Sequence, residues 1–338
     1  MTLAIDSGPN EPTLPATTIG GALDLAVERW GDREALVSVE QDVRFTYREL
    51  SEAVDLLARG LLARGVSRGD RVGIWSPNCY EWTLVQYATA RLGAILVTIN
   101  PAYRTHELAY VVEQAGLSLL VAAPSFKTSD YVAMVKEAAP SLDAVFFGSP
   151  EWDALSIEGD PLPDLDLRPD EAINIQYTSG TTGFPKGATL SHANILGNGF
   201  LVGELCGYTE VDRVCVPVPF YHCFGMVMGN LGALSHGACV VIPAPAFDPA
   251  ATMRAVAQEH CTSLYGVPTM FIAELGLPDF SSYDVSSLRT GIMAGSPCPV
   301  EVMKQVQVFM PEVTICYGMT ETSPVSTQTR SDDTLDRR

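Results

Sequence analysis

The sequence predicts an α/β protein in which two βα-layered subdomains are built on mostly parallel sheets. Strand-length apolar runs alternate with helix-length runs between residues 71 and 122, and a similar alternation resumes at residue 172. Strands separated by helices are typical of parallel βαβ units. The chain has 338 residues, of which 47% are hydrophobic and 18% charged, so it can bury one large core or two closely packed ones.

The first subdomain is predicted at residues 18–165, after a flexible polar lead-in at residues 1–17. Thr18 is placed to cap a helix that ends at Trp30. From Arg71 the chain reads strand, helix, strand, helix, strand. These five segments are RVGIWS, YEWTLVQYATARLG, AILVTIN, THELAYVVEQAG and LSLLVAA.

Glycine and proline positions support this order of elements. Gly93 and Gly116 follow the two helices, where left-handed C-caps belong. No GxGxxG pattern follows the first strand, so a dinucleotide-binding fold has little support. Residues 148–170 are rich in proline and aspartate, and we interpret them as a connector between the two subdomains.

The second subdomain is predicted at residues 166–330. Two strands, at 172–177 and 188–190, flank a glycine-rich loop, and Ser191 is predicted to cap the helix that follows. The closing residues 331–338 are charged and suit an exposed tail. Further strands are predicted in TSLYGVP, TGIMAG and VTICYG, and helices after Pro249 and Pro299.

Composition argues against several classes of function. The formal net charge of −19 disfavours binding to nucleic acid or to an anionic membrane surface. The eight cysteines form no CxxC pair and no zinc-ligand spacing, so we expect the reduced, buried thiols of a cytoplasmic protein. Residues 1–15 lack the pattern of a secretory signal, and no apolar run reaches membrane-spanning length.

Residues 177–188, YTSGTTGFPKGA, form the most informative segment of the chain. Its glycines can adopt backbone angles that point consecutive N–H groups at an anion, and its hydroxyls and its lysine add further donors. The Walker pattern GxxxxGK[ST] is not met, because Pro185 precedes Lys186 and Gly187 follows it. The segment alone leaves open a solvated Gly/Thr hairpin that binds nothing.

Three further segments follow this loop, namely VPFYHCFGM (218–226), GIMAGSPCP (291–299) and YGMTET (317–322). With the loop, and over residues 18–329, they resemble the AMP-binding superfamily of adenylate-forming enzymes, and most of all the bacterial medium-chain fatty acyl-CoA synthetases. The resemblance implies the large N-terminal domain of such an enzyme. It also implies that a fatty acid and Mg-ATP give an acyl adenylate and pyrophosphate, and that coenzyme A then takes the acyl group.

By this resemblance the loop holds the departing pyrophosphate while charge develops in the transition state. Thr320 would contact the α-phosphate, and Glu321 would hold Mg²⁺, because one carboxylate plus ATP oxygens is a common magnesium arrangement. Without the resemblance, Glu321 is better explained as a carboxylate at a helix N-terminus. The loop residues predicted to bind the nucleotide are Thr178, Ser179, Gly180, Thr181, Thr182, Gly183 and Lys186.

The resemblance also implies an adenine site. Tyr317 would stack on the base beside Gly318, although on sequence alone it could be a core aromatic. The other wall would consist of Gly295, Ser296 and Pro297, whose small size lets the backbone approach the base. A plain tight turn is the alternative for that wall.

His222 completes the predicted catalytic set of Lys186, Thr320 and Glu321. The resemblance places it at the acyl carboxylate, where we expect it to position or gate the acid, since a carboxylate is already ionised near pH 7. A satisfied core histidine is the alternative. The glycines at 225, 229 and 232 either leave room for an acyl chain or let helices pack closely; residues 265–269 would face the same tunnel.

Family members continue to a C-terminal lid domain that brings a catalytic lysine, whereas this sequence stops at Arg338. A domain on the order of 100 residues is therefore expected to be absent. Two hypotheses follow. The first is an acyl-CoA ligase, either truncated or with its partner domain elsewhere, whose partners are fatty acid, ATP and coenzyme A. The second is a nucleotide- or acyl-binding module without turnover. Either is compatible with a homodimer. A serine hydrolase is excluded by the lack of GxSxG, since ALSHG around Ser235 lacks the first glycine.

Overall fold

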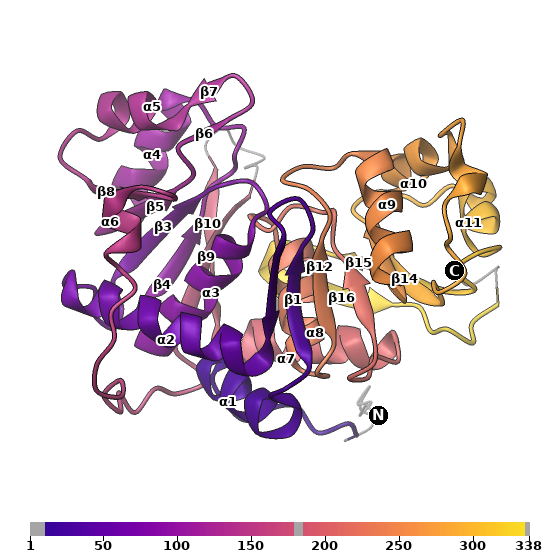
Figure 1. The fold of residues 1–338 in the computed structure, drawn as a ribbon, viewed down its shortest axis with the longest axis horizontal. Helices are drawn as coiled ribbons and strands as arrows, with labels where there is room; N and C mark the ends of the chain where they lie inside the picture. The colour runs from indigo at the N-terminus through magenta and orange to yellow at the C-terminus, as the bar shows by residue number, and fades with distance from the viewer. Residues whose placement is uncertain (1–10, 179–184, 335–338) are drawn as a thin grey trace, which may run out of the picture.

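The computed structural model describes residues 11–178 and 185–334. These residues form two lobes, each built around a sheet of mostly parallel strands, which confirms the predicted α/β class (Figure 1). A small hairpin projects from the first lobe, and its strands are β6 (Ser125–Phe126) and β7 (Ser129–Asp130).

The six-stranded sheet confirms the predicted βαβαβ order. Its strands all run parallel except β10, which lies antiparallel at one edge. Gly93 and Gly116 end the first two crossover helices with φ of 65° and 61°, a conformation that favours glycine. In spatial order the strands are β10 (Lys186–Ser191), β9 (Ala172–Thr178), β4 (Ile95–Thr98), β3 (Arg71–Trp75), β5 (Leu119–Ala122) and β8 (Asp143–Phe146).

The eight-stranded sheet is parallel in its centre and antiparallel at both edges. Strand β1, drawn in indigo in Figure 1, lies beside the orange strand β12, although the two are far apart in the sequence. In spatial order the strands are β16 (Val325–Gln328), β15 (Glu312–Gly318), β14 (Thr290–Ala294), β13 (Ser263–Gly266), β11 (Arg213–Cys215), β12 (Cys239–Ile242), β1 (Glu34–Ser38) and β2 (Val43–Thr46).

Several helices begin directly after a residue whose side chain caps their first turn. Thr18 and Ser191, both predicted caps, accept hydrogen bonds from the backbone N–H of Gly21 and Asn194. The α-helices are α1 (Ile19–Trp30), α2 (Tyr47–Ala63), α3 (Tyr80–Leu92), α4 (Thr105–Ala115), α5 (Tyr131–Ala138), α6 (Pro150–Asp153), α7 (His192–Leu205), α8 (Gly232–Leu234), α9 (Pro249–Glu259), α10 (Pro268–Leu275) and α11 (Val300–Val306). A π-helix, η1 (Phe224–Leu231), and two 3₁₀ turns, η2 (Phe280–Ser282) and η3 (Thr320–Thr322), complete them.

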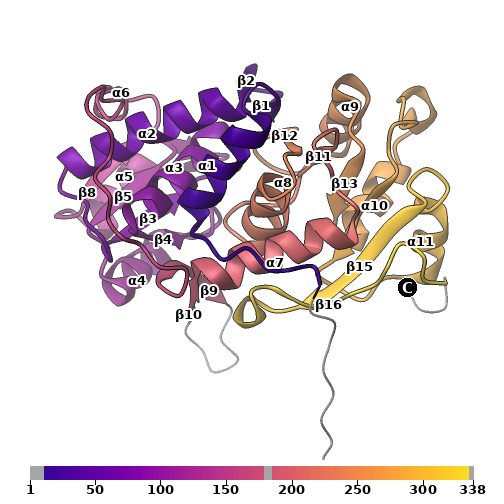
Figure 2. The same ribbon diagram turned by 90° about the horizontal axis from the view of Figure 1, so that it is seen from below.

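The two sheets do not follow a division of the chain at residue 165. Strands β9 and β10, which flank the glycine-rich loop, pair with β4 of the first lobe, whereas β1 and β2 join the sheet of the second. Helix α7 contacts both β10 and β16, and Figure 2 shows it passing from one lobe to the other. The chain therefore crosses between the lobes more than once.

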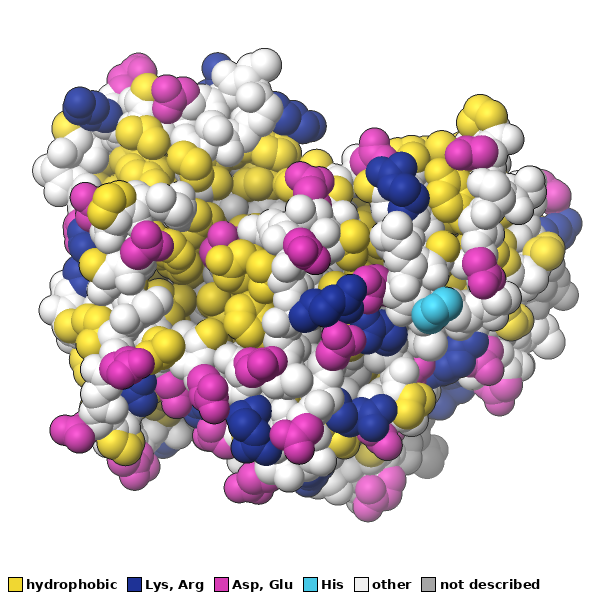
Figure 3. Space-filling view, viewed as in Figure 1, with side chains coloured by type: hydrophobic (Ala, Val, Ile, Leu, Met, Phe, Trp, Pro, Cys, Tyr) yellow, Lys and Arg dark blue, Asp and Glu magenta, His cyan; other side chains and the backbone are white. Residues whose placement is uncertain are grey.

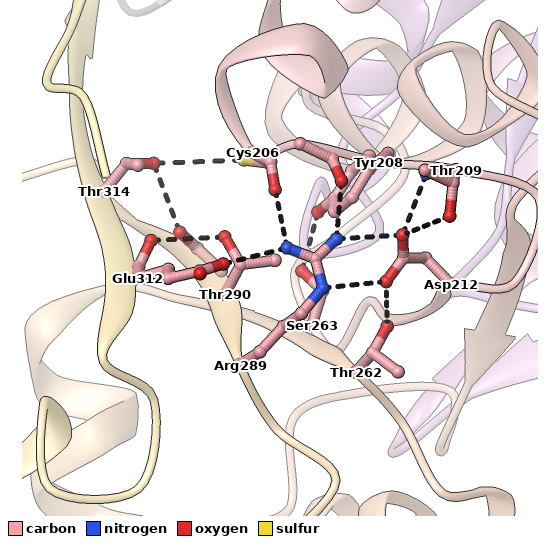
Figure 4. A network of polar contacts seen from close by, with 12 residues as sticks. Cys206, Tyr208, Thr209, Asp212, Thr262, Ser263, Arg289, Thr290, Glu312 and Thr314 are labelled. Carbon is pink, nitrogen blue, oxygen red and sulfur yellow. Dashed lines mark hydrogen bonds and ion pairs between the residues drawn. The ribbon is translucent and has the colours of Figure 1, made fainter. Parts of the chain in front are cut away.

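A cluster of charged and hydroxyl side chains fixes the amino ends of the strands in the second lobe (Figure 4). Arg289 donates to Asp212 at 2.8 Å and to Glu312 at 2.9 Å, and also to the backbone carbonyl groups of Cys206 and Gly207. Asp212 is nearly inaccessible and also accepts a hydrogen bond from Thr262 Oγ1 at 2.7 Å. We call this group the Arg289 cluster; it ties the end of α7 to β11, β13, β14 and β15.

On the face that Figure 3 shows, acidic side chains are dispersed and do not form one patch. Figure 3 shows acidic and basic side chains interspersed over the lower part of the face in view, while hydrophobic side chains gather over the first lobe and beside the notch between the lobes. Within the described residues, no helix is long and apolar enough to span a bilayer. All eight cysteines are free thiols, and seven of them are buried.

Glu274 on α10 is a buried carboxyl group in the core of the second lobe. It is 1% exposed, and no atom of the described residues hydrogen-bonds to either of its carboxyl oxygens. Burial raises the pKa of Glu274 well above its ordinary value of 4.5. The folded pKa therefore lies above the unfolded one, so protonation of Glu274 stabilises the folded state. This stability is fully present below pH 4.5 and is lost as pH rises through the folded pKa.

We therefore expect Glu274→Met to stabilise the protein at pH 8 by about 1–3 kcal/mol. Methionine fills a similar volume without a group to ionise, so its advantage should shrink at pH 5. Urea denaturation at both pH values measures this difference. Glu137→Met on the exposed side of α5 is the control, and an advantage for Glu274→Met that did not change with pH would contradict the argument.

Candidate active site

A cavity of about 640 Å³ lies between the lobes, where strands of both sheets end. Strands β4 and β9 lead into it from one sheet, and β15 leads into it from the other. Ligands of open α/β sheets bind at the carboxyl ends of the strands, so its position is that of a ligand site. Its lining consists of Thr98, Asn100, Tyr103, Tyr177, Thr178, Pro185, Tyr221, His222, Met319, Thr320 and Glu321.

The structure brings the two ends of the predicted nucleotide site together in this cavity, which we call the larger cavity. Thr178 ends β9, and its hydroxyl group donates to Glu321 Oε1 at 3.3 Å across the gap between the lobes. Thr320, beside Glu321 in η3, is 7% exposed. Lys186 begins β10 directly opposite Thr178 in the antiparallel pair, and its side chain is exposed. The predicted loop residues Ser179, Gly180, Thr181, Thr182 and Gly183 lie outside the described residues.

A second, smaller cavity of about 190 Å³ adjoins the first, and three residues line both: His222, Met319 and Thr320. The lining of the smaller cavity is largely apolar and comes from the start of η1, the end of β14 and the turn between β15 and β16. Its residues are His222, Cys223, Phe224, Met228, Ala294, Gly295, Cys316, Tyr317, Gly318, Met319, Thr320, Pro324 and Val325.

His222 stands at the junction of the two cavities and is not a core histidine. The backbone N–H of Phe224 donates to its Nδ1 at 3.1 Å, so the proton of the neutral ring lies on Nε2. The side chain is accessible from the cavities, yet the protein atoms around it lower its pKa by desolvation. The imidazole is therefore neutral at pH 7 and offers one N–H donor.

The residues of the predicted adenine site lie in or beside the smaller cavity. Tyr317 is 66% exposed, so the core alternative for this tyrosine is wrong. Gly295 has a φ of 86° and lines the smaller cavity with Tyr317, while Ser296 and Pro297 follow it as exposed residues outside the lining of either cavity.

Gly318 sits where β15 turns toward β16. A Cβ atom there would lie 1.9 Å from the carbonyl oxygen of Pro324, so no larger residue fits without moving the turn. Gly318 and its chain neighbours Tyr317 and Met319 all line the smaller cavity.

The glycines of η1 pack closely against their neighbours. A Cβ atom on Gly225 would lie 2.6 Å from the carbonyl oxygen of Pro219, and one on Gly229 would lie 3.0 Å from Val216. Neither glycine lines the smaller cavity. Of the two interpretations for these positions, close packing is therefore the one observed.

Seven residues that line the larger cavity were not among the predicted site residues: Thr98, Asn100, Tyr103, Tyr177, Pro185, Tyr221 and Met319. Asn100 and Tyr103 follow β4, and the break at Asn100–Pro101 was a signal of a strand end. Because that strand precedes a crossover helix, its carboxyl end could have been assigned to the ligand-binding edge. Tyr221 directly precedes His222, within a segment that the motif had already singled out.

The donor set around Glu321 suits one kind of metal ion. Among the described residues no three His, Cys, Asp or Glu side chains cluster to form a complete metal site. Magnesium instead keeps several water ligands and binds through one or two carboxylates plus substrate phosphates. Glu321, with its neighbouring hydroxyl groups, fits that mode.

Solved structures share this fold. An inhibitor-bound N-terminal domain of FACL13 from Mycobacterium tuberculosis superimposes with a TM-score of 0.84 at 24% identity, covering 95% of this chain and 80% of that one. The anthranilate CoA ligase AuaEII in complex with anthranoyl-AMP gives a TM-score of 0.85 at 22% identity, covering 95% of this chain and 63% of that one. At these identities the likeness concerns the fold alone.

Sequence relatives are more similar. YngI of Bacillus subtilis (strain 168) is 42% identical over 354 residues, which cover 95% of this chain and 64% of YngI. The mitochondrial medium-chain acyl-CoA ligase ACSF2 of Danio rerio is 39% identical over 366 residues, covering 96% of this chain and 59% of the ligase. The chain thus spans less than two thirds of these relatives. The family model for the AMP-binding enzyme matches residues 23–338, and the chain belongs to that family.

Proposed function

We propose that this chain carries the substrate-activating site of an AMP-forming ligase that converts a fatty acid, through its acyl adenylate, to acyl-CoA. The observation that carries the proposal is the contact between Thr178 and Glu321 in a cavity that shares His222 with an apolar cavity. The polar side suits the phosphates of ATP, and the apolar side suits an acyl chain. The relatives named as medium-chain ligases support an acid of medium length.

In the adenylation step a carboxylate oxygen of the acid attacks the α-phosphorus of ATP, and the bond from that phosphorus to the bridging oxygen breaks. Pyrophosphate leaves with the electron pair. The hydroxyl groups of Thr178 and Thr320 and the ammonium group of Lys186 would donate to phosphate oxygens as their charge grows. No proton has to be removed, because the acid is already ionised at pH 7.

His222 would orient the acid. Its Nδ1 is engaged by the backbone of Phe224. Its Nε2–H, which lies 4.0 Å from Cys223 Sγ, is therefore the group that would donate to a carboxylate oxygen at the junction of the cavities. The depressed pKa keeps the ring neutral, and a neutral donor holds the nucleophile without a full counter-charge. Glu321 would hold a magnesium ion, which neutralises phosphate charge when it is bound.

The test is pyrophosphate release by the purified 338-residue chain with Mg-ATP and a panel of acids: butanoate, octanoate, dodecanoate, hexadecanoate and benzoate. Acid-dependent release that is strongest with octanoate or its neighbours is the expected result. A folded sample that binds ATP and acid but releases no pyrophosphate with any of them would contradict the ligase proposal, and would leave a binding module.

The relatives named above include proteins described as mitochondrial. For this chain we propose the cytoplasm, a reducing compartment, on the ground that its eight cysteines are all free thiols. Fractionation of the source cells tests this location. Formation of a homodimer stays a prediction, which sedimentation of the purified chain would check.

A further inference from the structure

We propose that Asn198 on α7 is a positioning residue, which keeps Glu321 beside the phosphate site when the hydroxyl group of Thr178 turns to ATP. This inference rests on the proposed function, since it takes Glu321 as the residue that holds magnesium. Residues 319–324, which contain η3 and Glu321, we call the η3 turn. The proposal assigns the position of this turn to one side chain that lines neither cavity.

Asn198 joins α7 to the strand that follows the η3 turn. Its Nδ2 donates to the carbonyl oxygen of Val325 at 2.9 Å, and its Oδ1 accepts from the backbone N–H of the same residue at 3.0 Å. One amide side chain thus binds both backbone groups of Val325, as a neighbouring strand would. The two residues are 127 positions apart in the sequence, so the contact joins separate elements of the fold.

Helix α7 is continuous with the strand that carries Lys186. Strand β10 begins at Lys186 and leads directly into α7, where the hydroxyl group of Ser191 accepts from the backbone N–H of Asn194 and caps the helix. Asn198 lies about two turns into the helix. It therefore ties Val325 to the same run of strand and helix that carries the lysine of the phosphate loop.

The η3 turn is closed by the hydroxyl group of Thr322. Its Oγ1 accepts from the backbone N–H of Met319 at 3.1 Å and donates to the carbonyl oxygen of Pro324 at 2.7 Å. Glu321 lies between these two ends of the turn, and Val325 directly follows Pro324. A side chain that holds Val325 therefore also holds the turn that carries the carboxylate of Glu321.

The direct contact between the lobes at the site does not survive the binding of ATP in the proposed reaction. The hydroxyl group of Thr178 donates to Glu321 Oε1 at 3.3 Å. A threonine hydroxyl has one proton, so it cannot donate to Glu321 and to a phosphate oxygen at once. The contact of Asn198 with Val325 remains when ATP takes this donor, because Asn198 lines neither cavity and no ligand there competes for it.

Strand pairing still holds the η3 turn when Asn198 is replaced. Tyr317 pairs with Thr327 and Gly318 pairs with Val325 across β15 and β16, so Asn198→Ala should leave the turn folded but let it shift. A misplacement of about 1 Å can slow a reaction by about 100-fold. We expect Asn198→Ala to slow acid-dependent pyrophosphate release by about 10- to 100-fold, with the affinity for octanoate unchanged.

Hydrogen exchange tests the contact without any ligand. Mass spectrometry of the peptide that contains Val325 should show faster exchange in Asn198→Ala than in the native chain. The matched control is Glu204→Ala on the same helix, which removes a contact with His236 at 3.1 Å and lies outside both cavity linings. This control should keep the native exchange at Val325 and the native rate of pyrophosphate release.

A double-mutant cycle separates positioning from a general loss of structure. If Asn198 acts through Glu321, adding Asn198→Ala to Glu321→Gln should slow the reaction by less than about twofold, because the carboxylate to be positioned is already absent. Equal slowing by Asn198→Ala in the native chain and in Glu321→Gln would show that Asn198 acts elsewhere, and would overturn the proposal.

The affinity for ATP gives a readout that needs no turnover. Calorimetry measures the dissociation constant of ATP with magnesium chloride and with EDTA. The native chain should bind ATP about 5- to 150-fold more tightly with magnesium, the usual range for coupled ligands. This ratio should fall toward one in Glu321→Gln and in Asn198→Ala, and should stay native in Glu204→Ala.

The outcomes separate the two proposals. If the ratio falls in Asn198→Ala but no acid releases pyrophosphate from the native chain, the positioning proposal stands and the ligase proposal fails. If the native chain releases pyrophosphate and Asn198→Ala keeps both the native rate and the native ratio, the positioning proposal is overturned and the ligase proposal stands. If the folded native chain does not bind ATP, both are overturned.

Discussion

Glu321→Gln is expected to slow acid-dependent pyrophosphate release by about 100- to 1000-fold, in the range seen when one group that stabilises transition-state charge is removed. Glutamine keeps the shape of the side chain and can still accept from Thr178, whose hydroxyl group lies 3.3 Å from Oε1. What it loses is the negative charge that suits a cation beside the phosphates. The effect should therefore appear in kcat, with little change in the affinity for the fatty acid.

The control for this prediction is Glu301→Gln. Glu301 is exposed on α11 and pairs with Lys304 at 2.7 Å, far from either cavity lining. The same assay should give the native rate for this variant. An unchanged rate for Glu321→Gln would show that η3 contributes only its backbone, and would remove the carboxylate from the catalytic set.

Arg289→Ala should have the largest effect on stability, lowering the free energy of unfolding by about 3–5 kcal/mol. The guanidinium group holds two carboxylates and two backbone carbonyl groups at the amino ends of the strands, as Figure 4 shows. Its removal leaves the carboxylate of Asp212 in a nearly inaccessible position without a counter-charge. Urea denaturation followed by circular dichroism measures the loss.

The pH dependence of the Arg289 cluster has a definite sign. Burial by itself would raise the pKa of Asp212, but the hydrogen bonds from Arg289, Thr262 and the backbone of Thr209 outweigh it and hold the pKa below its ordinary value of 3.8. The stability from this group is therefore present above pH 3.8 and is lost as pH falls through the folded pKa.

The matched control is Arg168→Ala, which removes a largely exposed pair with Asp170 and should cost less than about 1 kcal/mol. Equal urea midpoints for the two variants would contradict the importance of the Arg289 cluster. The difference in stability between Arg289→Ala and the native chain should also shrink as pH falls below 3.8, because protonated Asp212 no longer needs a cation.

Local signals in the sequence were enough for the βαβαβ run at residues 71–122. Alternating apolar runs and the glycines at 93 and 116 give the order of strands and helices, because each crossover is a short-range event. The pairing of β1 with β12 could not be predicted in this way. It joins residues from opposite halves of the chain, and no local propensity records which distant strand a segment will meet.

The candidate site shows the same limit. The motifs identified Thr178, His222 and Glu321, but only the fold shows that the hydroxyl group of Thr178 contacts Glu321 across the lobes. The π-helix at η1 was also beyond prediction, since an apolar run with glycines suits an α-helix equally well. The hydrogen bond between Tyr208 and Tyr265 and the stacking of Phe224 on Tyr265 join separate segments of the chain, so no local pattern predicts them.

The position of β1 also bears on how the chain is made. Leu36 pairs with Val240, about 200 residues later, and ribosomes add about 5–20 residues per second. For about 10–40 s of synthesis, the apolar stretch Ala35–Val37 has left the ribosome while the strand that will cover it does not yet exist. During translation β1 can pair only with β2, which follows it at once, and its parallel neighbour β12 is added last.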